Sequence, residues 1–222
     1  MTYILPMLSV LVGYAVALIL RPKSTQGIKL LLAFSGSYLL SITVLEFLPE
    51  IYKSELPHIG LFIMGGILLQ IVLEFFSKGA EHGHLHFDEN QSQLPWLLLA
   101  SLSLHAFLEG FPLHDRAHLL QGVVLHKLPV AIILSSFLLG SNISRGKSLL
   151  FLIIFGLMTP LGSWVSDWFP QLMQWEAYIN AVVVGIFLHI STTILFEASK
   201  NHRFNATKMA TIIIGFLLAY FT

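Results

Sequence analysis

The sequence predicts an all-α protein that crosses a membrane several times, and three observations lead to this fold class. Of the 222 residues, 55% are hydrophobic and only 11% are charged, whereas a soluble domain has about 25% charged residues. The mean hydropathy is +0.78. Apolar stretches of about 20 residues, the length with which a helix crosses a bilayer, follow one another with short connections. This chain has too little charge to coat a soluble globule.

Eight apolar stretches fill the chain, so we expect a single transmembrane domain over residues 1–222. The first stretch could be mistaken for a signal peptide, because "AVA" at 15–17 resembles a cleavage site. No positive charge precedes it and "RPK" follows it, so we expect it to be retained. The predicted spans are 3–20, 28–49, 59–76, 95–113, 118–140, 148–169, 177–198 and 206–222.

Composition also excludes several classes of protein. The formal net charge is zero and there is no basic tract, which argues against a nucleic-acid partner. The absence of cysteine excludes disulfides and thiolate metal ligands. No phosphate-binding loop is present, so ATP is not expected to drive any activity.

The basic residues predict the orientation of the spans. Nine of the twelve lie in or beside the connections after spans one, three, five and seven, whereas only Lys53 and Arg116 lie on the opposite side. The twelfth, Lys127, lies inside a span. Because cytoplasmic loops carry the excess of Lys and Arg, both termini should be extracytoplasmic. The nine residues are Arg21, Lys23, Lys29, Lys78, Arg145, Lys147, Lys200, Arg203 and Lys208.

A weak internal similarity links the two halves of the chain. "GSYLLSITVLEFLPE" in span two and "GIFLHISTTILFEA" in span seven both run from Gly-x-x-Leu to a glutamate near the end. With eight spans, these two would have opposite orientations. This is the pattern of transporters with inverted repeats, whose binding sites lie near the membrane midplane.

Spans four and five carry a group of ionisable residues that a membrane segment would normally avoid. "LSLHAFLEGFPL" at 102–113 places His105 and Glu109 four residues apart, on one face of a helix. "VVLHKLPVA" in the next span adds His126 and Lys127. Each such group costs about 2.5–3.5 kcal/mol at mid-bilayer unless it finds a partner. Nitrogen and carboxylate ligands together suit Zn²⁺ and other first-row divalent ions; the alternative is hydrogen bonding between helices, with Glu109 as the expected partner of Lys127.

Several other polar residues are weaker candidates. The loop 77–94 is predicted to be cytoplasmic, and it is either a flexible metal-capturing tract or a solvated linker. Glu46 in span two and His189 in span seven are candidate pathway residues. His114, Asp115 and His118 form either an entrance funnel or a solvated turn. The histidines that would capture metal in the loop are His82, His84 and His86.

These motifs resemble the ZIP (Zrt-, Irt-like protein) family of divalent metal transporters. "HAFLEG" at 105–110 is similar to the family's His-Asn-x-Pro-Glu-Gly, and "HKLPVA" at 126–131 resembles its span-five motif. "FLPE" closing span two and "GIFLH" at 185–189 are further similarities. The resemblance covers essentially the whole chain and marks a divergent, prokaryotic-type member. It implies a 3+2+3 bundle, in which two inverted three-span repeats surround the two metal-bearing spans.

The chain departs from the family pattern at every ligand of a second metal site. Ala106, Lys127, Val130 and Thr159 stand where family members with two sites have an amide or acidic ligands. The resemblance therefore implies one metal site, formed by His105, Glu109 and His126. The ammonium of Lys127 would stand where a second cation would lie.

We thus expect a transporter, not an enzyme, that moves Zn²⁺ or a similar ion (Fe²⁺, Mn²⁺, Co²⁺, Cd²⁺) into the cytoplasm across the cell membrane. Its expected partners are the metal ion, the lipid bilayer and a second copy in a homodimer. Protonation of the ligands would compete with metal, so transport should depend on pH. Two alternatives stay open: a ZIP-fold metal sensor that does not transport, and a metal-dependent intramembrane hydrolase with Glu109 as its base.

Overall fold

The computed structural model describes residues 2–20, 25–80, 92–197 and 206–222, and the regular structure in these residues is entirely helical. The all-α prediction is therefore confirmed for this part of the chain. In order along the sequence, the helices are α1 (Leu5–Leu20), α2 (Thr25–Ile42), the π-helical turn η1 (Thr43–Phe47), α3 (Leu48–Tyr52), α4 (Ile59–Ser77), α5 (Trp96–Gly110), the short η3 (Phe111–Leu113), α6 (Ala117–Gly140), α7 (Arg145–Trp168), η4 (Pro170–Trp175), α8 (Glu176–Glu197) and α9 (Ala206–Phe221).

Each predicted span coincides with a helical segment, and within the described ranges six segments are long and apolar enough to cross a membrane. The two terminal helices, α1 and α9, are also apolar but have only 16 residues each. At 1.5 Å per residue, such a helix covers about 24 Å of a hydrocarbon core about 30 Å thick. The structure thus supports a polytopic membrane protein with six candidate spans and two shorter apolar helices at its ends.

The second span is longer than predicted, because α2, η1 and α3 form one helical segment over Gln26–Tyr52. The π-helical turn lies directly before α3, whose second residue is Pro49. Proline has no N–H to donate, so the regular i→i−4 hydrogen bond is missing at this position. Single π-turns inside helices often occur at functional sites. This turn carries Glu46, whose carboxylate lies against His118 of α6.

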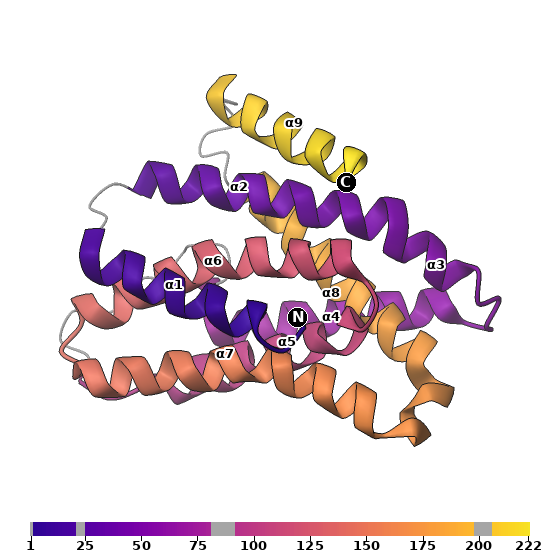
Figure 1. The fold of residues 1–222 in the computed structure, drawn as a ribbon, viewed down its shortest axis with the longest axis horizontal. Helices are drawn as coiled ribbons and strands as arrows, with labels where there is room; N and C mark the ends of the chain where they lie inside the picture. The colour runs from indigo at the N-terminus through magenta and orange to yellow at the C-terminus, as the bar shows by residue number, and fades with distance from the viewer. Residues whose placement is uncertain (1, 21–24, 81–91, 198–205) are drawn as a thin grey trace.

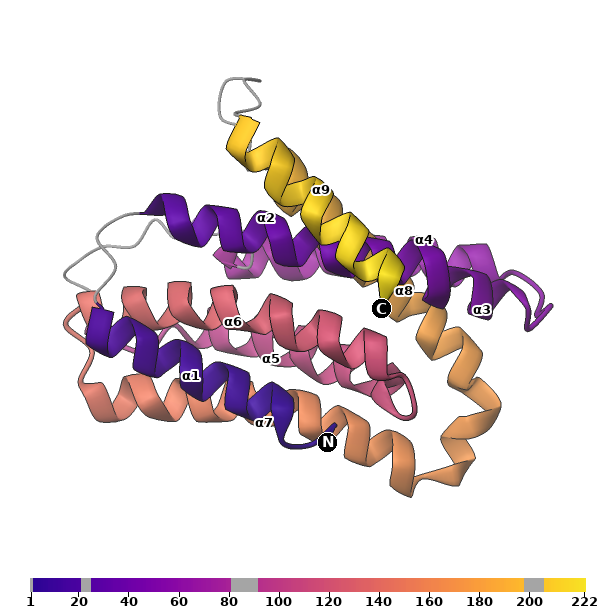
Figure 2. The ribbon, with the colours of Figure 1, turned by 45° about the horizontal axis from the view of Figure 1, so that its top comes forward.

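The helices run roughly along one axis, with α9 crossing α2 on the outside of the bundle (Figures 1 and 2). Within the bundle, α6 packs against α1 and α2, whereas α5 packs against α7 and α4. Helix α8 packs against α4 and α2. Helices α5 and α6, the predicted carriers of the metal site, therefore have neighbours from both ends of the chain.

Glycines set the closest helix contacts. A Cβ added at Gly66 of α4 would collide with the carbonyl oxygen of Val182 in α8, and one at Gly185 of α8 would collide with that of Ile63 in α4. Small residues allow membrane helices to approach this closely, because no bulky side chain separates the two backbones. Such close packing matters in a membrane, since apolar side chains gain little from leaving lipid for one another. These contacts fix how the helices register against each other, and hence which polar side chains meet.

Candidate metal centre

The candidate centre lies between α5, α6 and α7. The first two are joined by a short turn, and a close contact holds α7 against α5. A Cβ added at Gly110 of α5 would collide with the carbonyl oxygen of Thr159, and one at Gly162 of α7 with that of Phe107. The Ser163 hydroxyl also donates a hydrogen bond of 2.7 Å to the carbonyl oxygen of Gly110. Together these contacts bring Thr159 beside Glu109.

Four ionisable side chains on α5 and α6 are buried at this place. His105 and His126 are each 3% exposed, Glu109 is 1% exposed and Lys127 is 2% exposed. Charged residues are almost never this deeply buried without a partner. Their burial on two facing helices is the feature of the fold that most needs a functional explanation.

Glu109 connects these side chains. Lys127 Nζ lies 2.6 Å from Glu109 Oε1, and the Thr159 hydroxyl donates a hydrogen bond of 2.6 Å to the same oxygen. The other oxygen, Oε2, lies 3.4 Å from His105 Nε2. The two oxygens of this carboxylate therefore have different roles: one is held by α6 and α7, and the other faces the imidazole of α5.

Lys127 has a second favourable contact. Its Nζ lies 4.3 Å from the centroid of the Phe155 ring on α7, a distance at which the face of the ring attracts a cation. The carboxylate partner expected for Lys127 is thus present, and the aromatic ring stabilises the same charge from another direction.

A small cavity separates the candidate ligands. Its volume is about 10 Å³, close to the smallest volume that holds one water molecule. The cavity is lined by Leu102, His105, Glu109, His126, Lys127, Val130 and Phe155. The three predicted ligands and Lys127 therefore face one space, as their sequence positions suggested.

In this conformation the ligands are not in coordination geometry. Among the residues that the structure describes, no three His, Asp or Glu side chains lie close enough together to hold a metal ion. Lys127 occupies one oxygen of Glu109, and the cavity is too small for a hydrated ion. The assignment of His105, Glu109 and His126 as ligands thus stays a prediction, and it requires a rearrangement on binding.

The other predicted site residues lie elsewhere. Glu46 pairs with His118, whose Nδ1 lies 3.0 Å from its carboxylate. His189 Nε2 of α8 lies 2.6 Å from Glu74 Oε2 of α4. His82, His84 and His86 lie outside the described residues, so metal capture by that loop stays a prediction.

Sequence reasoning passed over Glu74, although a lone carboxylate in the apolar stretch "LLQIVLEFFS" is itself a signal. His114 and Asp115, the candidates for an entrance funnel, belong to an ionic network around the turn between α5 and α6, and the sequence did not predict the other members of that network. Arg116 NH2 lies 2.7 Å from Glu50 Oε1 of α3 and 3.5 Å from Glu176 Oε1 of α8. His114 lies 3.1 Å from Asp167 of α7 and 3.1 Å from its neighbour Asp115.

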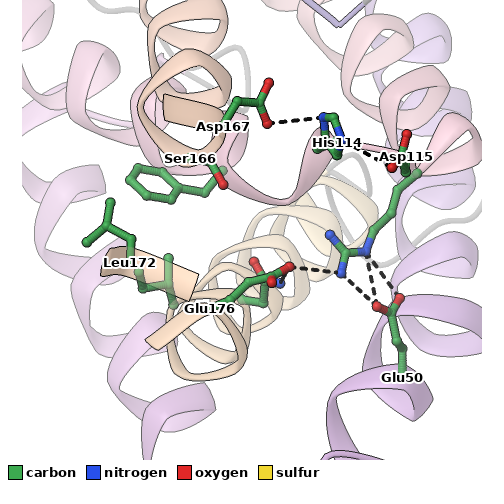
Figure 3. A pocket seen from close by; sticks show the side chains of 11 residues that line it. Glu50, His114, Asp115, Ser166, Asp167, Leu172 and Glu176 are labelled. Atoms are coloured by element: carbon green, nitrogen blue, oxygen red, sulfur yellow. Dashed lines mark hydrogen bonds and ion pairs between the residues drawn. The ribbon is translucent and has the colours of Figure 1, made fainter. Parts of the chain in front are cut away.

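This network lines a pocket of about 500 Å³ at the same end of the bundle (Figure 3). Burial disfavours the charged form of Arg116, but the hydrogen bonds and charges of Glu50 and Glu176 outweigh that effect and raise its pKa above the ordinary value. The pocket shares no lining residue with the small central cavity. A charged vestibule and a closed interior site are therefore separate in this conformation.

These features define a class of protein: a multi-pass helical membrane protein with a buried ionic site between its central helices. The sequence model of the family described as "ZIP Zinc transporter" matches residues 78–222, more than half of the chain. The chain therefore belongs to the ZIP zinc transporter family.

A curated relative agrees with this assignment. The zinc transporter ZIP1 of Danio rerio is 26% identical over 148 residues, which cover 64% of this chain and 49% of the relative. The chain thus spans about half the length of the curated relative that it matches.

Proposed function

We infer that this protein carries divalent transition-metal ions, Zn²⁺ most readily, across the membrane and into the cytoplasm through one intramembrane site. His105, Glu109 and His126 would bind the ion, and Lys127 would replace a second one. The observation that carries the proposal is the burial of these four side chains around one cavity between α5 and α6. Family membership and the zinc transporter among its relatives support the same reading.

The ion pair between Lys127 and Glu109 neutralises the site when no metal is bound. With both imidazoles neutral, the charges of Lys127 and Glu109 cancel, so the closed cavity has no net charge. An unpaired carboxylate at this depth would be costly. An incoming divalent ion would bind the carboxylate while the ammonium stays beside it, and the repulsion between the two cations would weaken that binding. Weak, reversible binding of this kind is what conduction requires.

Four of the main helix contacts support the proposed inverted repeat. Exchanging α1 with α7, α2 with α8, α4 with α9 and α5 with α6 converts the contact α4–α8 into α9–α2. The same exchange converts α1–α6 into α7–α5, and all four contacts are present. We propose that the pair α5–α6 moves against these two three-helix units, so that the central site opens to each side in turn.

The distribution of basic residues supports the proposed direction. Figure 1 shows α2, α7 and α9 beginning toward one end of the bundle, and the first two turns of these helices carry Lys29, Arg145, Lys147 and Lys208. We assign this end to the cytoplasm by the positive-inside rule. The pocket around Arg116 would then be the outer vestibule, and both termini would be extracytoplasmic.

The test is uptake of Zn²⁺ into proteoliposomes, with the wild-type protein beside His105→Ala, at two pH values. Saturable uptake that vanishes in the variant supports transport through this site. Wild-type uptake that matches protein-free vesicles would contradict it.

One observation favours a second candidate function, a metal sensor that does not transport. The closed cavity and the Lys127–Glu109 pair would also suit a protein that binds metal without passing it on. Metal binding to the purified protein that requires His105, with no uptake into vesicles, would support the sensor.

A further inference from the structure

The two carboxylate oxygens of Glu109 have different surroundings. Oε1 accepts a hydrogen bond of 2.6 Å from Thr159 Oγ1 and forms an ion pair with Lys127 Nζ, which also lies 2.6 Å away. The hydroxyl and the ammonium therefore both lie against this one oxygen. Only Oε2, on the His105 side, is left with capacity to bind an ion.

Thr159 is held in position by the backbone around it. It is completely buried, and its own carbonyl oxygen lies where a Cβ at Gly110 would be. The hydrogen bond from Ser163 to Gly110, one turn further along α7, ties the same helices together. The Thr159 hydroxyl therefore has little freedom to leave Glu109 while α5 and α7 stay packed.

We propose that Thr159, acting with Lys127, is a positioning residue that determines which metals the site accepts. It limits Glu109 to a single ligand oxygen, so the ion would meet one carboxylate oxygen and two imidazole nitrogens. That donor set selects ions that take nitrogen ligands in tetrahedral geometry, such as Zn²⁺. It rejects Mn²⁺ and Mg²⁺, which prefer six oxygen ligands. This inference rests on the proposed function, since it concerns the same site.

The small size of the cavity also favours Zn²⁺ over Mn²⁺ and Mg²⁺. Its volume of about 10 Å³ is that of about one water molecule, so each water that enters with the ion requires the site to open further. A six-coordinate ion would have to bring three or more waters with it, whereas a tetrahedral ion held by three side chains needs only one. Freeing the second carboxylate oxygen would supply a further oxygen ligand without additional water, and would favour Mn²⁺.

The decisive variant is Thr159→Val, which removes the hydroxyl and keeps the shape of the side chain. Thr159→Ser keeps the hydroxyl. Ser163→Ala is the matched control, because it deletes another buried hydroxyl of α7 that bonds to α5 but does not touch Glu109. The measurement is the ratio of Mn²⁺ to Zn²⁺ taken up by proteoliposomes, together with the same ratio for binding to purified protein in detergent.

The wild type should strongly prefer Zn²⁺. Thr159→Val should raise the Mn²⁺-to-Zn²⁺ ratio about tenfold, the effect of one hydrogen bond to a charged group. Thr159→Ser and Ser163→Ala should keep the wild-type ratio, although either can lower total uptake. If Thr159→Val does not fold, Thr159→Ala makes the same test without the branched side chain.

A wild type that accepts both ions equally, or a ratio unchanged in Thr159→Val, would overturn this inference and leave the proposed function standing. An equal shift in Ser163→Ala would also overturn it, because a general packing effect would then explain the result. Binding ratios that follow the expected pattern without any uptake would contradict transport and support the role of Thr159. A wild type that neither binds nor transports these ions would overturn both.

Discussion

Glu109 links three helices, because it contacts His105 on its own helix, Lys127 on α6 and Thr159 on α7. Each partner controls a different property. Lys127 balances the charge, Thr159 orients the carboxylate, and His105 stands beside the oxygen that remains available. A single substitution at this residue therefore disturbs ligand chemistry and electrostatics together, whereas changes at its partners separate the two.

Glu109→Gln is expected to reduce Zn²⁺ uptake to the level of protein-free vesicles, because an amide neither carries the ligand charge nor balances Lys127. Glu55→Gln is the control, since Glu55 is an exposed carboxylate. Both proteins should be compared in proteoliposomes after their elution from a sizing column is shown to match the wild type. Full uptake by Glu109→Gln would eliminate the site assignment.

Lys127→Met is expected to destabilise the protein by about 3–5 kcal/mol, because it leaves a buried carboxylate without its cation. The double variant Glu109→Gln/Lys127→Met should be more stable than Lys127→Met alone, since both charges are removed together. Thermal unfolding in detergent measures both effects. If the two single changes simply add in the double variant, the two side chains are not coupled.

At the scale of helices, close backbone contacts decide which polar side chains meet. Helices α5 and α7 meet at Gly110 and Gly162, and α4 and α8 meet at Gly66 and Gly185. The same two helices, α4 and α8, also carry the paired side chains of Glu74 and His189. Each of these polar pairs thus depends on a neighbouring glycine contact for its register.

Gly66→Ala and Gly65→Ala test this dependence with adjacent residues of one helix. The added methyl group at position 66 would strike the carbonyl oxygen of Val182, whereas at position 65 it would meet nothing within 4 Å. Gly66→Ala should lower stability by about 1–3 kcal/mol, a typical cost of overpacking. Gly65→Ala should be neutral or slightly stabilising, because alanine favours the helix. Equal thermal unfolding of the two variants would contradict the assigned packing.

At the scale of the whole molecule, the turn between α5 and α6 is fastened to the helices around it. Arg116 reaches Glu50 of α3 and Glu176 of α8, and its NH1 donates a hydrogen bond of 2.8 Å to the carbonyl oxygen of Pro112. His114 reaches Asp167 of α7. If α5 and α6 move as a pair during transport, these links must break. The raised pKa of Arg116 keeps the guanidinium charged throughout any practical assay range, so its links do not weaken as pH rises through neutrality.

Arg116→Gln is therefore expected to increase access to the interior from this end. The chain has no cysteine, so Val123→Cys introduces a single thiol at a position that is completely buried in this structure. Its labelling by a water-soluble maleimide should become several-fold faster in the Arg116→Gln background. Arg145→Gln removes an exposed arginine at the start of α7 and should leave the rate unchanged. Equal rates in all three proteins would show that the Arg116 links do not hold this end closed.

Much of the architecture follows directly from the order of residues. Hydropathy located each helix to within a few residues, because a span must consist mostly of apolar side chains whatever lies next to it. The spacing of His105 and Glu109 placed them on one face, since that relation is internal to a helix. The π-helical turn in span two was not predicted, because the choice between i→i−4 and i→i−5 hydrogen bonds leaves no mark on the apolar pattern. The continuation of that span to Tyr52 was not predicted either.

The sequence by itself determined that this chain is a helical membrane protein with ionisable groups in spans four and five, because helix length and helical periodicity are local properties. The sequence also predicted the pairing of Lys127 with Glu109, whereas only the tertiary structure decided which partners come from more distant helices. Thr159 lies 50 residues from Glu109, and Glu74 lies 115 residues from His189. Such partners are selected by helix register, which the glycine contacts between non-neighbouring helices set. For the same reason, only the folded chain distinguishes the two oxygens of Glu109.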